Sequence, residues 1–302
     1  MNATTLLDGG MGKELRRIGA PFRQPEWSAL ALNEAPEMVV RAHTNFIDAG
    51  AEVIITNNYA VVPYHLGDEM IATRGAELTA LAGRLARQAA DGADRDVLVA
   101  GSLPPLFGSY EPDQFDPVRA PALYRMIVSA LAPHVDLWLT ETLSTVAELE
   151  AIANVVAAGG AGKPLWASFT LPERWADDTI TLRSGESIDD VISTIDDHDD
   201  LVEAALFNCA LPEQIGPALD VLAAGLHAAG LDVRTGAYAN AFPESRDDGY
   251  AANAVILERR DDLTPHRYAD IVGEWIAGGA TIVGGCCDMY PEHIAELARR
   301  FL

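Results

Sequence analysis

The chain carries eight short runs of apolar residues, most of them continuous rather than alternating with polar positions. Continuous apolarity is typical of parallel strands that are buried on both faces of a sheet. We therefore predict a strand at each run. The runs are residues 6–8, 53–56, 97–100, 137–140, 165–168, 205–207, 233–238 and 281–283.

Segments with a helical period separate these runs, because their apolar residues recur every three to four positions. Pro212, Pro265 and Pro291 stand at the starts of such segments, where proline suits the first turn of a helix. The acidic segment 187–197 is short and has the least regular pattern. The predicted helices are residues 37–49, 69–91, 121–133, 146–158, 187–197, 212–229, 265–277 and 291–301.

This alternation of eight β-then-α units predicts a (β/α)8 TIM barrel, formed by residues 1–302 as a single domain. Long connections follow the strands at 106–120, 171–186 and 241–263, and we expect them to act as lids or substrate walls. A doubly wound sheet is the alternative. It would want a glycine-rich phosphate loop after an early strand, and residues 8–12 match that spacing poorly.

Charge and composition narrow the class of protein. The net charge of −24 repels phosphate backbones, so we expect no nucleic-acid partner. The acidic surface could steer a cationic substrate, although solubility is the plainer explanation. No apolar run approaches the ~18 residues of a membrane helix, and residues 1–5 do not resemble a signal peptide. We expect a cytoplasmic enzyme for small-molecule substrates, with no membrane contact, as a monomer or small homo-oligomer.

Three cysteines carry the strongest chemical signal. Cys209 ends one apolar run, and Cys286 and Cys287 end another after Gly284 and Gly285. Neighbouring side chains on a strand point to opposite faces, so we expect the two glycines to bend the chain and let both cysteines face one atom. An odd number of cysteines suits a reducing compartment with metal or thiol chemistry. The predicted site is Zn²⁺ held by three thiolates; the alternative is three small buried side chains.

A zinc ion with three thiolates carries net negative charge, which makes it a weak Lewis acid for producing hydroxide. Such a site suits a substrate thiol that must stay nucleophilic at neutral pH, so the cysteines favour S-alkylation. We take Cys209, Cys286 and Cys287 as both the metal ligands and the catalytic residues.

Polar residues also follow the predicted strands, where this fold builds its active site. Asp8 could accept from a substrate ammonium, and the backbone of Gly9 and Gly10 could hold a carboxylate; a tight turn with a capping aspartate is the alternative. Glu141 either pairs with a cationic group or caps the next helix. The remaining predicted substrate-binding residues are Thr56, Asn57, Tyr59 and Asn208. Tyr59, Tyr110 and Trp175 could face a cationic donor, and the alternative is that these aromatic residues anchor the core or a loop. His43, on the first predicted helix, is expected to be a packing or hydrogen-bonding residue.

Together these residues resemble the homocysteine S-methyltransferase family. The resemblance covers nearly the whole chain in order, at residues 8–12, 43–59, 141–142, 208–209 and 284–287. It implies a (β/α)8 barrel whose zinc is held by Cys209, Cys286 and Cys287, with the sulfur of homocysteine as fourth ligand. It also implies that Asp8, Gly9 and Glu141 hold the amino-acid end of homocysteine.

We therefore expect methyl transfer to homocysteine from a sulfonium or quaternary ammonium donor, giving methionine. S-methylmethionine is the first candidate donor, followed by S-adenosylmethionine and a betaine-like compound. The chain departs from the family pattern at Lys13, Asn58, 101–105 and 239–241, and the last three could touch the donor. The alternatives are another thiol or selenol acceptor, a zinc or thiol-ligand binding barrel without turnover, and an unrelated barrel enzyme whose cysteines are merely buried.

Overall fold

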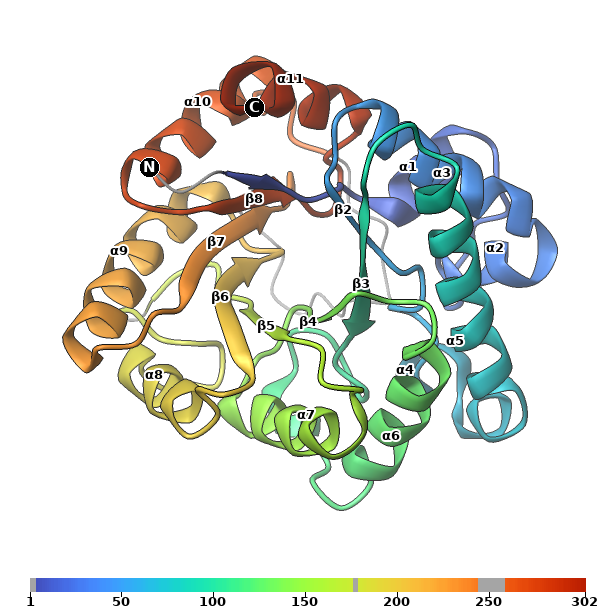
Figure 1. Cartoon of the computed structure of the whole chain (residues 1–302), viewed down its shortest axis with the longest axis horizontal. Coiled ribbons are helices and arrows are strands. Elements are labelled where there is room, and N and C mark those ends of the chain that lie inside the picture. The colour runs from blue at the N-terminus through green and yellow to red at the C-terminus, as the bar shows by residue number, and fades with distance from the viewer. Residues whose placement is uncertain (1–3, 176–178, 244–258) are drawn as a thin grey trace.

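The computed structural model describes residues 4–175, 179–243 and 259–302 and shows eight parallel strands. Neighbouring strands follow the order β1-β8-β7-β6-β5-β4-β3-β2, and a parallel bridge between Leu7 and Val53 joins β1 to β2. The strands therefore form a barrel, which Figure 1 shows as a central ring surrounded by helices. The strands are β1 (Thr5–Leu6), β2 (Val53–Ile55), β3 (Leu98–Leu103), β4 (Leu137–Thr140), β5 (Leu165–Phe169), β6 (Val202–Asn208), β7 (Arg234–Ala239) and β8 (Ile282–Gly285).

Every predicted strand position contains a strand, so the TIM barrel prediction is confirmed and the doubly wound sheet is excluded. The apolar runs are continuous because each strand has two buried faces. One cluster, including Leu7, Leu139 and Ile282, fills the barrel interior. A larger cluster, including Trp138 and Phe207, lies between the strands and the helices.

The helices surround the barrel and begin where the sequence predicts, including the proline starts at Pro212, Pro265 and Pro291. The helix at 188–196 is stabilised by a capping box between Ser187 and Asp190. The helices are α1 (Met11–Arg17), α2 (Ala29–Glu34), α3 (Pro36–Asp48), α4 (Pro63–Leu66), α5 (Asp68–Asp91), η1 (Pro112–Gln114), α6 (Ala120–Leu131), α7 (Val146–Gly159), α8 (Ile188–Asp196), α9 (Pro212–Ala229), α10 (Pro265–Ala277) and α11 (Pro291–Phe301).

The sequence did not predict α1, α2 and α4. These helices have 7, 6 and 4 residues, so they are too short to show a clear helical period. Of the long connections, 106–120 is described in full, whereas 176–178 and 244–258 lie outside the described residues. Within the described residues, no helix combines the length and apolarity that crossing a membrane requires.

Candidate active site

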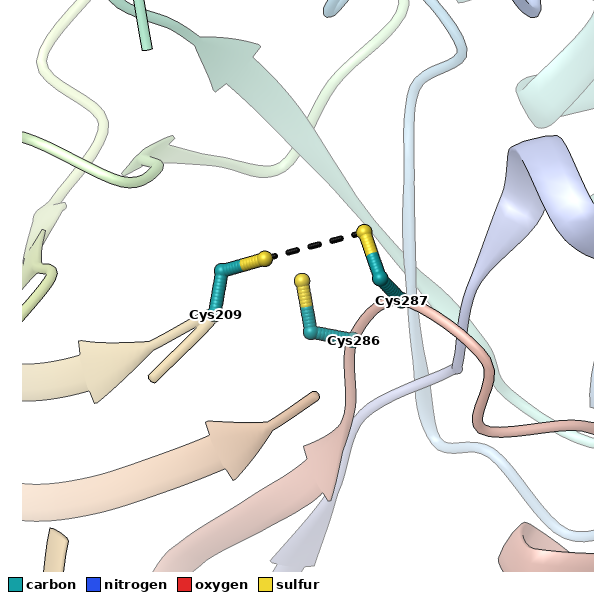
Figure 2. Close-up of side chains that lie close together, drawn as sticks. All are labelled: Cys209, Cys286 and Cys287. Atoms are coloured by element: carbon teal, nitrogen blue, oxygen red, sulfur yellow. Dashed lines mark hydrogen bonds between the residues drawn. The ribbon is translucent and has the colours of Figure 1, made fainter. Parts of the chain in front are cut away.

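Three cysteines meet beyond the carboxyl ends of two strands. Cys209 directly follows β6, and Cys286 and Cys287 directly follow β8. Their sulfurs all lie within 4.8 Å of one another, with 3.6 Å between the Cys209 and Cys287 sulfurs. Figure 2 shows the three side chains pointing toward one another. The sulfurs therefore form one cluster, and their role as metal ligands stays a prediction.

The prediction that Gly284 and Gly285 bend the chain is wrong. Both belong to β8, and neither has a positive φ. A Cβ at Gly284 would lie 2.5 Å from the Leu7 Cβ, and one at Gly285 would lie 2.4 Å from the Met289 Cβ. These glycines are needed for their small volume, because neighbouring segments pack directly against the strand.

Left-handed backbone occurs instead at residues with a side chain. Four of them surround the cysteine cluster: Tyr110 (φ 68°), Thr142 (φ 60°), Cys209 (φ 49°) and Asp288 (φ 63°). Each such residue costs on the order of 1–3 kcal/mol and persists only where its surroundings hold it in place. Strain of this kind is concentrated at functional sites, which favours a functional role for this end of the barrel.

The geometry of the cluster fits a tetrahedral metal. Zinc–sulfur bonds of about 2.3 Å place two thiolate sulfurs about 3.8 Å apart, close to the 3.6 Å between the Cys209 and Cys287 sulfurs. Hydrogen bonding with Cys209, together with burial, raises the pKa of Cys286 and of Cys287 well above the usual range. Three thiolates would repel one another here, so a divalent cation is the natural partner that would let all three lose their protons.

Two buried carboxyl groups, Asp8 and Glu141, line the same cavity as the sulfurs. Asp8 Oδ2 accepts from the Ile55 N–H at 2.9 Å, while Oδ1 is buried and has no hydrogen-bond partner among the described residues. Burial raises the pKa of Asp8 well above its usual range. Burial also raises the pKa of Glu141 to about 7, although a hydrogen bond from the Ser102 hydroxyl opposes the shift. An ammonium group would supply the positive charge that both carboxyl groups lack.

The cavity has a volume of about 170 Å³ and joins almost all the residues predicted for the site. It is lined by residues at the ends of β1, β2, β4, β6, β7 and β8 and by the connection after β3. The predicted residues on its wall are Asp8, Gly9, Gly10, Thr56, Asn57, Tyr59, Glu141, Cys209, Cys286 and Cys287.

Three of these residues have partners that fix their side chains. The Thr56 hydroxyl donates to Asn58 Oδ1 at 2.6 Å, and the Asn57 amide donates to the Ser28 carbonyl at 3.1 Å. The Tyr59 hydroxyl lies 2.6 Å from Ser109 Oγ. The aromatic ring of Tyr59, whose position is fixed by this contact, therefore lines the cavity.

Asn208 is predicted to bind substrate but does not line the cavity. Its Oδ1 accepts from the Thr142 N–H at 2.7 Å and from Ser168 Oγ at 2.8 Å, and its Nδ2 donates to the Thr142 hydroxyl at 2.9 Å. These bonds hold Thr142 in its left-handed conformation. The observed contacts of Asn208 therefore support the wall behind Glu141.

The contacts of Gly9 and Gly10 differ from the expected carboxylate cradle. The Gly10 N–H donates to the Met289 carbonyl at 2.9 Å, so this group already has a protein partner. A Cβ at Gly10 would lie 2.7 Å from the Cys286 carbonyl oxygen, and one at Gly9 would lie 2.5 Å from the Met289 carbonyl oxygen. The two glycines let the start of α1 approach the segment that carries the cysteine pair.

Two further residues on the cavity wall make contacts that the sequence did not predict. Lys13, on the cavity wall, forms an ion pair of 2.9 Å with the buried Asp288, next to Cys287. Tyr110 donates its hydroxyl to the Cys209 sulfur at 2.9 Å. The sequence offered one indication for each residue: Lys13 departs from the family pattern, and Tyr110 lies in a long connection.

His43 is buried on α3, as expected for a packing residue. Burial lowers its pKa to about 3, and neither buried ring nitrogen has a hydrogen-bond partner in the part of the chain that the structure describes. It does not line the cavity, so its role lies in the packing of the helical layer.

Comparison with known proteins gives a consistent result. The curated homocysteine S-methyltransferase of Escherichia coli (strain K12) is 31% identical over 316 residues, covering 98% of this chain and 94% of that protein. A selenocysteine methyltransferase of Astragalus bisulcatus is 27% identical over 322 residues, covering 96% and 90% of the two chains. The crystal structure of the metallated homocysteine methyltransferase MmuM from Escherichia coli matches with a TM-score of 0.75 at 28% identity, covering 99% of this chain and 96% of that one.

The family model described as homocysteine S-methyltransferase matches residues 5–301, which span the barrel from its first strand to its last helix. The resemblance read from the cysteines, the aspartate–glycine turn and Glu141 thus agrees with the match over the whole fold. The chain belongs to the homocysteine S-methyltransferase family.

Proposed function

We propose that this protein is a zinc-dependent S-methyltransferase that makes methionine from homocysteine and a cationic methyl donor. The observation that carries the proposal is a single cavity that joins three clustered sulfurs to two buried carboxyl groups. A thiol amino acid needs both parts, because its sulfur must be activated and its ammonium must be held. The assignment of residues 1–302 to one homocysteine-binding domain, and the cytoplasmic location, are further predictions.

Cys209, Cys286 and Cys287 would hold the zinc ion. When bound there, zinc would take the acceptor thiol as a thiolate, which keeps the sulfur nucleophilic at neutral pH. The Asn240 amide donates to the Cys209 carbonyl at 2.7 Å, and Asp288, next to Cys287, forms an ion pair of 2.9 Å with Lys13 on α1. The protein thus supplies a fixed set of three sulfurs.

Charges on the cavity wall match the other end of homocysteine. Asp8 and Glu141 would bind its ammonium, and their protons would leave as the cation enters, because a nearby positive charge favours the carboxylate form. Lys13 would contact its carboxylate, since it is the only lysine or arginine among the described residues that line the cavity. This arrangement would orient the acceptor so that its sulfur faces the donor methyl group.

The donor carries positive charge at the atom that holds the methyl group. The acceptor sulfur attacks the methyl carbon, the bond from that carbon to the donor sulfur or nitrogen breaks, and its electron pair stays on the leaving group. A cationic donor leaves neutral, so no general acid is required. Tyr59 and Trp27 offer aromatic faces on the cavity wall, which suit a sulfonium or quaternary ammonium group. We rank S-methylmethionine first, then S-adenosylmethionine, then a betaine-like donor.

A selenol acceptor is the second candidate. It is supported by the similarity to a selenocysteine methyltransferase over 96% of this chain. Selenocysteine is one methylene shorter than homocysteine, but it carries the same ammonium and carboxylate groups and would use the same sulfur cluster and carboxyl groups. Competition between homocysteine and selenocysteine at a fixed donor concentration would measure which acceptor has the higher kcat/KM.

The test is to incubate zinc-loaded protein with homocysteine and each donor in turn, measuring methionine and bound zinc in the same sample. We expect methionine with at least one sulfonium donor and one zinc per chain. Zinc and homocysteine binding without methionine from any donor would favour a binding protein without turnover. Protein that takes up no zinc would instead favour a barrel whose cysteines are merely buried.

A further inference from the structure

Two long connections, which follow different strands, meet at the Cys209 sulfur. Tyr110 lies in the connection after β3, and its hydroxyl donates to Cys209 Sγ at 2.9 Å. Arg183 lies in the connection after β5, and its guanidinium carbon is 4.6 Å from the centre of the Tyr110 ring. Neither residue belongs to the sulfur cluster, yet together they link it to both loops.

Arg183 is itself held in place. It forms an ion pair of 2.6 Å with Glu173, and only 12% of its side chain is exposed. A guanidinium group over an aromatic face is attracted to the ring, more strongly where water is excluded. The result is a continuous chain of contacts from Glu173 through Arg183 and Tyr110 to Cys209.

Cys209 needs such support more than its partners do. It comes from β6, whereas Cys286 and Cys287 follow β8, so the cluster forms only if the Cys209 side chain crosses the gap between the strand ends. Its backbone is strained at φ 49°, and its carbonyl accepts from Asn240 at 2.7 Å and from Thr170 at 3.3 Å. These bonds hold the backbone, while the Cys209 sulfur itself accepts from the Tyr110 hydroxyl at 2.9 Å and, at the longer distance of 3.9 Å, from the Asn240 amide.

We propose that Tyr110 is a positioning residue that fixes the Cys209 sulfur for metal binding, and that Arg183 holds the Tyr110 ring over it. The inference rests on the proposed zinc site. It adds that the position of the Tyr110 hydroxyl and metal binding are thermodynamically linked, so each favours the other. Residues behind metal ligands typically change metal affinity by about 10–100-fold.

The experiment measures zinc affinity by competition with a chelator for three single variants and the natural protein. Tyr110→Phe keeps the ring for Arg183 but removes the hydroxyl, and we expect zinc affinity to fall about 10–100-fold. Arg183→Met keeps the hydroxyl, and we expect a smaller loss in the same direction. Tyr64→Phe is the matched control, because the Tyr64 hydroxyl donates to Glu111, next to Tyr110, at 3.0 Å and does not contact a sulfur. Its zinc affinity should stay unchanged.

A spectroscopic measurement separates positioning from general loop order. With Co²⁺ in place of zinc, the sulfur-to-cobalt charge-transfer band should shift in Tyr110→Phe and not in Tyr64→Phe. Equal zinc affinity and an unshifted band in Tyr110→Phe would overturn the inference while leaving the zinc site intact. Equal losses in Tyr110→Phe and Tyr64→Phe would also overturn it, because loop order alone would then explain them. Failure of the natural protein to bind zinc would remove both this inference and the proposed function.

Discussion

The cavity has two halves that differ in the cation they suit: a sulfur half, formed by Cys209, Cys286 and Cys287, and a carboxyl half, formed by Asp8 and Glu141. The three sulfurs lie within 4.8 Å of one another, so they are arranged around a single point. Among the described residues, the hydrogen-bond donors to Asp8 and Glu141 are neutral groups, the Ile55 N–H and the Ser102 hydroxyl. The sulfur half is suited to a small ion that stays bound in fixed geometry. The carboxyl half is suited to an organic cation that enters and leaves with each turnover.

Cys286→Ser should have the largest effect, because it breaks the sulfur half alone. Substituting a residue that supports a metal ligand can weaken metal binding by up to about 100-fold. Substituting the ligand itself should weaken zinc binding by more than that. We expect the purified variant to contain no zinc and to make no methionine. Metal analysis and a methionine assay on one sample would check this. Full zinc content with normal turnover would show that Cys286 is not a ligand.

Glu141→Gln should break the carboxyl half and leave the sulfur half intact. Loss of a buried carboxylate that pairs with the substrate ammonium should lower kcat/KM for homocysteine about 100-fold, which corresponds to about 3 kcal/mol. Zinc content should stay at the natural level. Glu148→Gln is a matched control, since Glu148 is also buried with its pKa raised to about 7 but lies outside the cavity. A similar loss in both variants would mean that Glu141 has no special role in binding.

The same contrast explains what the sequence could predict. Cys209, Cys286 and Cys287 were identifiable because parallel strands bring their carboxyl ends to one end of a barrel. The role of Gly284 and Gly285 could not be identified from the sequence, because a sequence does not distinguish a glycine needed for its φ from one needed for its small volume. Asn208 precedes Cys209 directly, yet its amide faces Thr142 rather than the cavity.

The contacts that the long loops make could not be predicted from the sequence either. Tyr110 contacts a sulfur 99 positions further along the chain, and only tertiary folding determines where the loop at 106–120 returns. Lys13 stood out as a departure from the family pattern, but its partner Asp288 is brought close by the packing of α1 against the segment after β8. Strand ends could thus be predicted from local pattern, and loop contacts could not.

The raised pKa of Glu141 makes a prediction about stability in the metal-free protein. Its carboxyl holds a proton up to pH about 7 when folded but only to about 4.5 when unfolded. The folded state therefore binds more protons than the unfolded state between these pH values. The contribution of Glu141 to the free energy of unfolding is fully present below pH 4.5 and is lost as pH rises through about 7. The shift corresponds to up to about 3 kcal/mol. Denaturant unfolding at pH 5 and pH 8 would measure the free energy of unfolding of the natural protein and of Glu141→Gln. We expect this free energy to fall less between the two pH values in the variant. An equal fall in both proteins would contradict the raised pKa of Glu141.

Lys13→Met should have the smallest effect, and it asks whether the carboxyl half has a cationic counterpart. Losing one charge-assisted contact to the substrate carboxylate should raise KM for homocysteine about 10-fold, with kcat unchanged. An acceptor without a carboxylate, 3-aminopropanethiol, should show the same KM with both proteins. Arg16→Met is the matched control, because Arg16 is an exposed cation on the same helix and lies outside the cavity. If Lys13→Met raised KM equally for both acceptors, the ion pair with Asp288 would serve the structure of the site rather than recognition of a carboxylate.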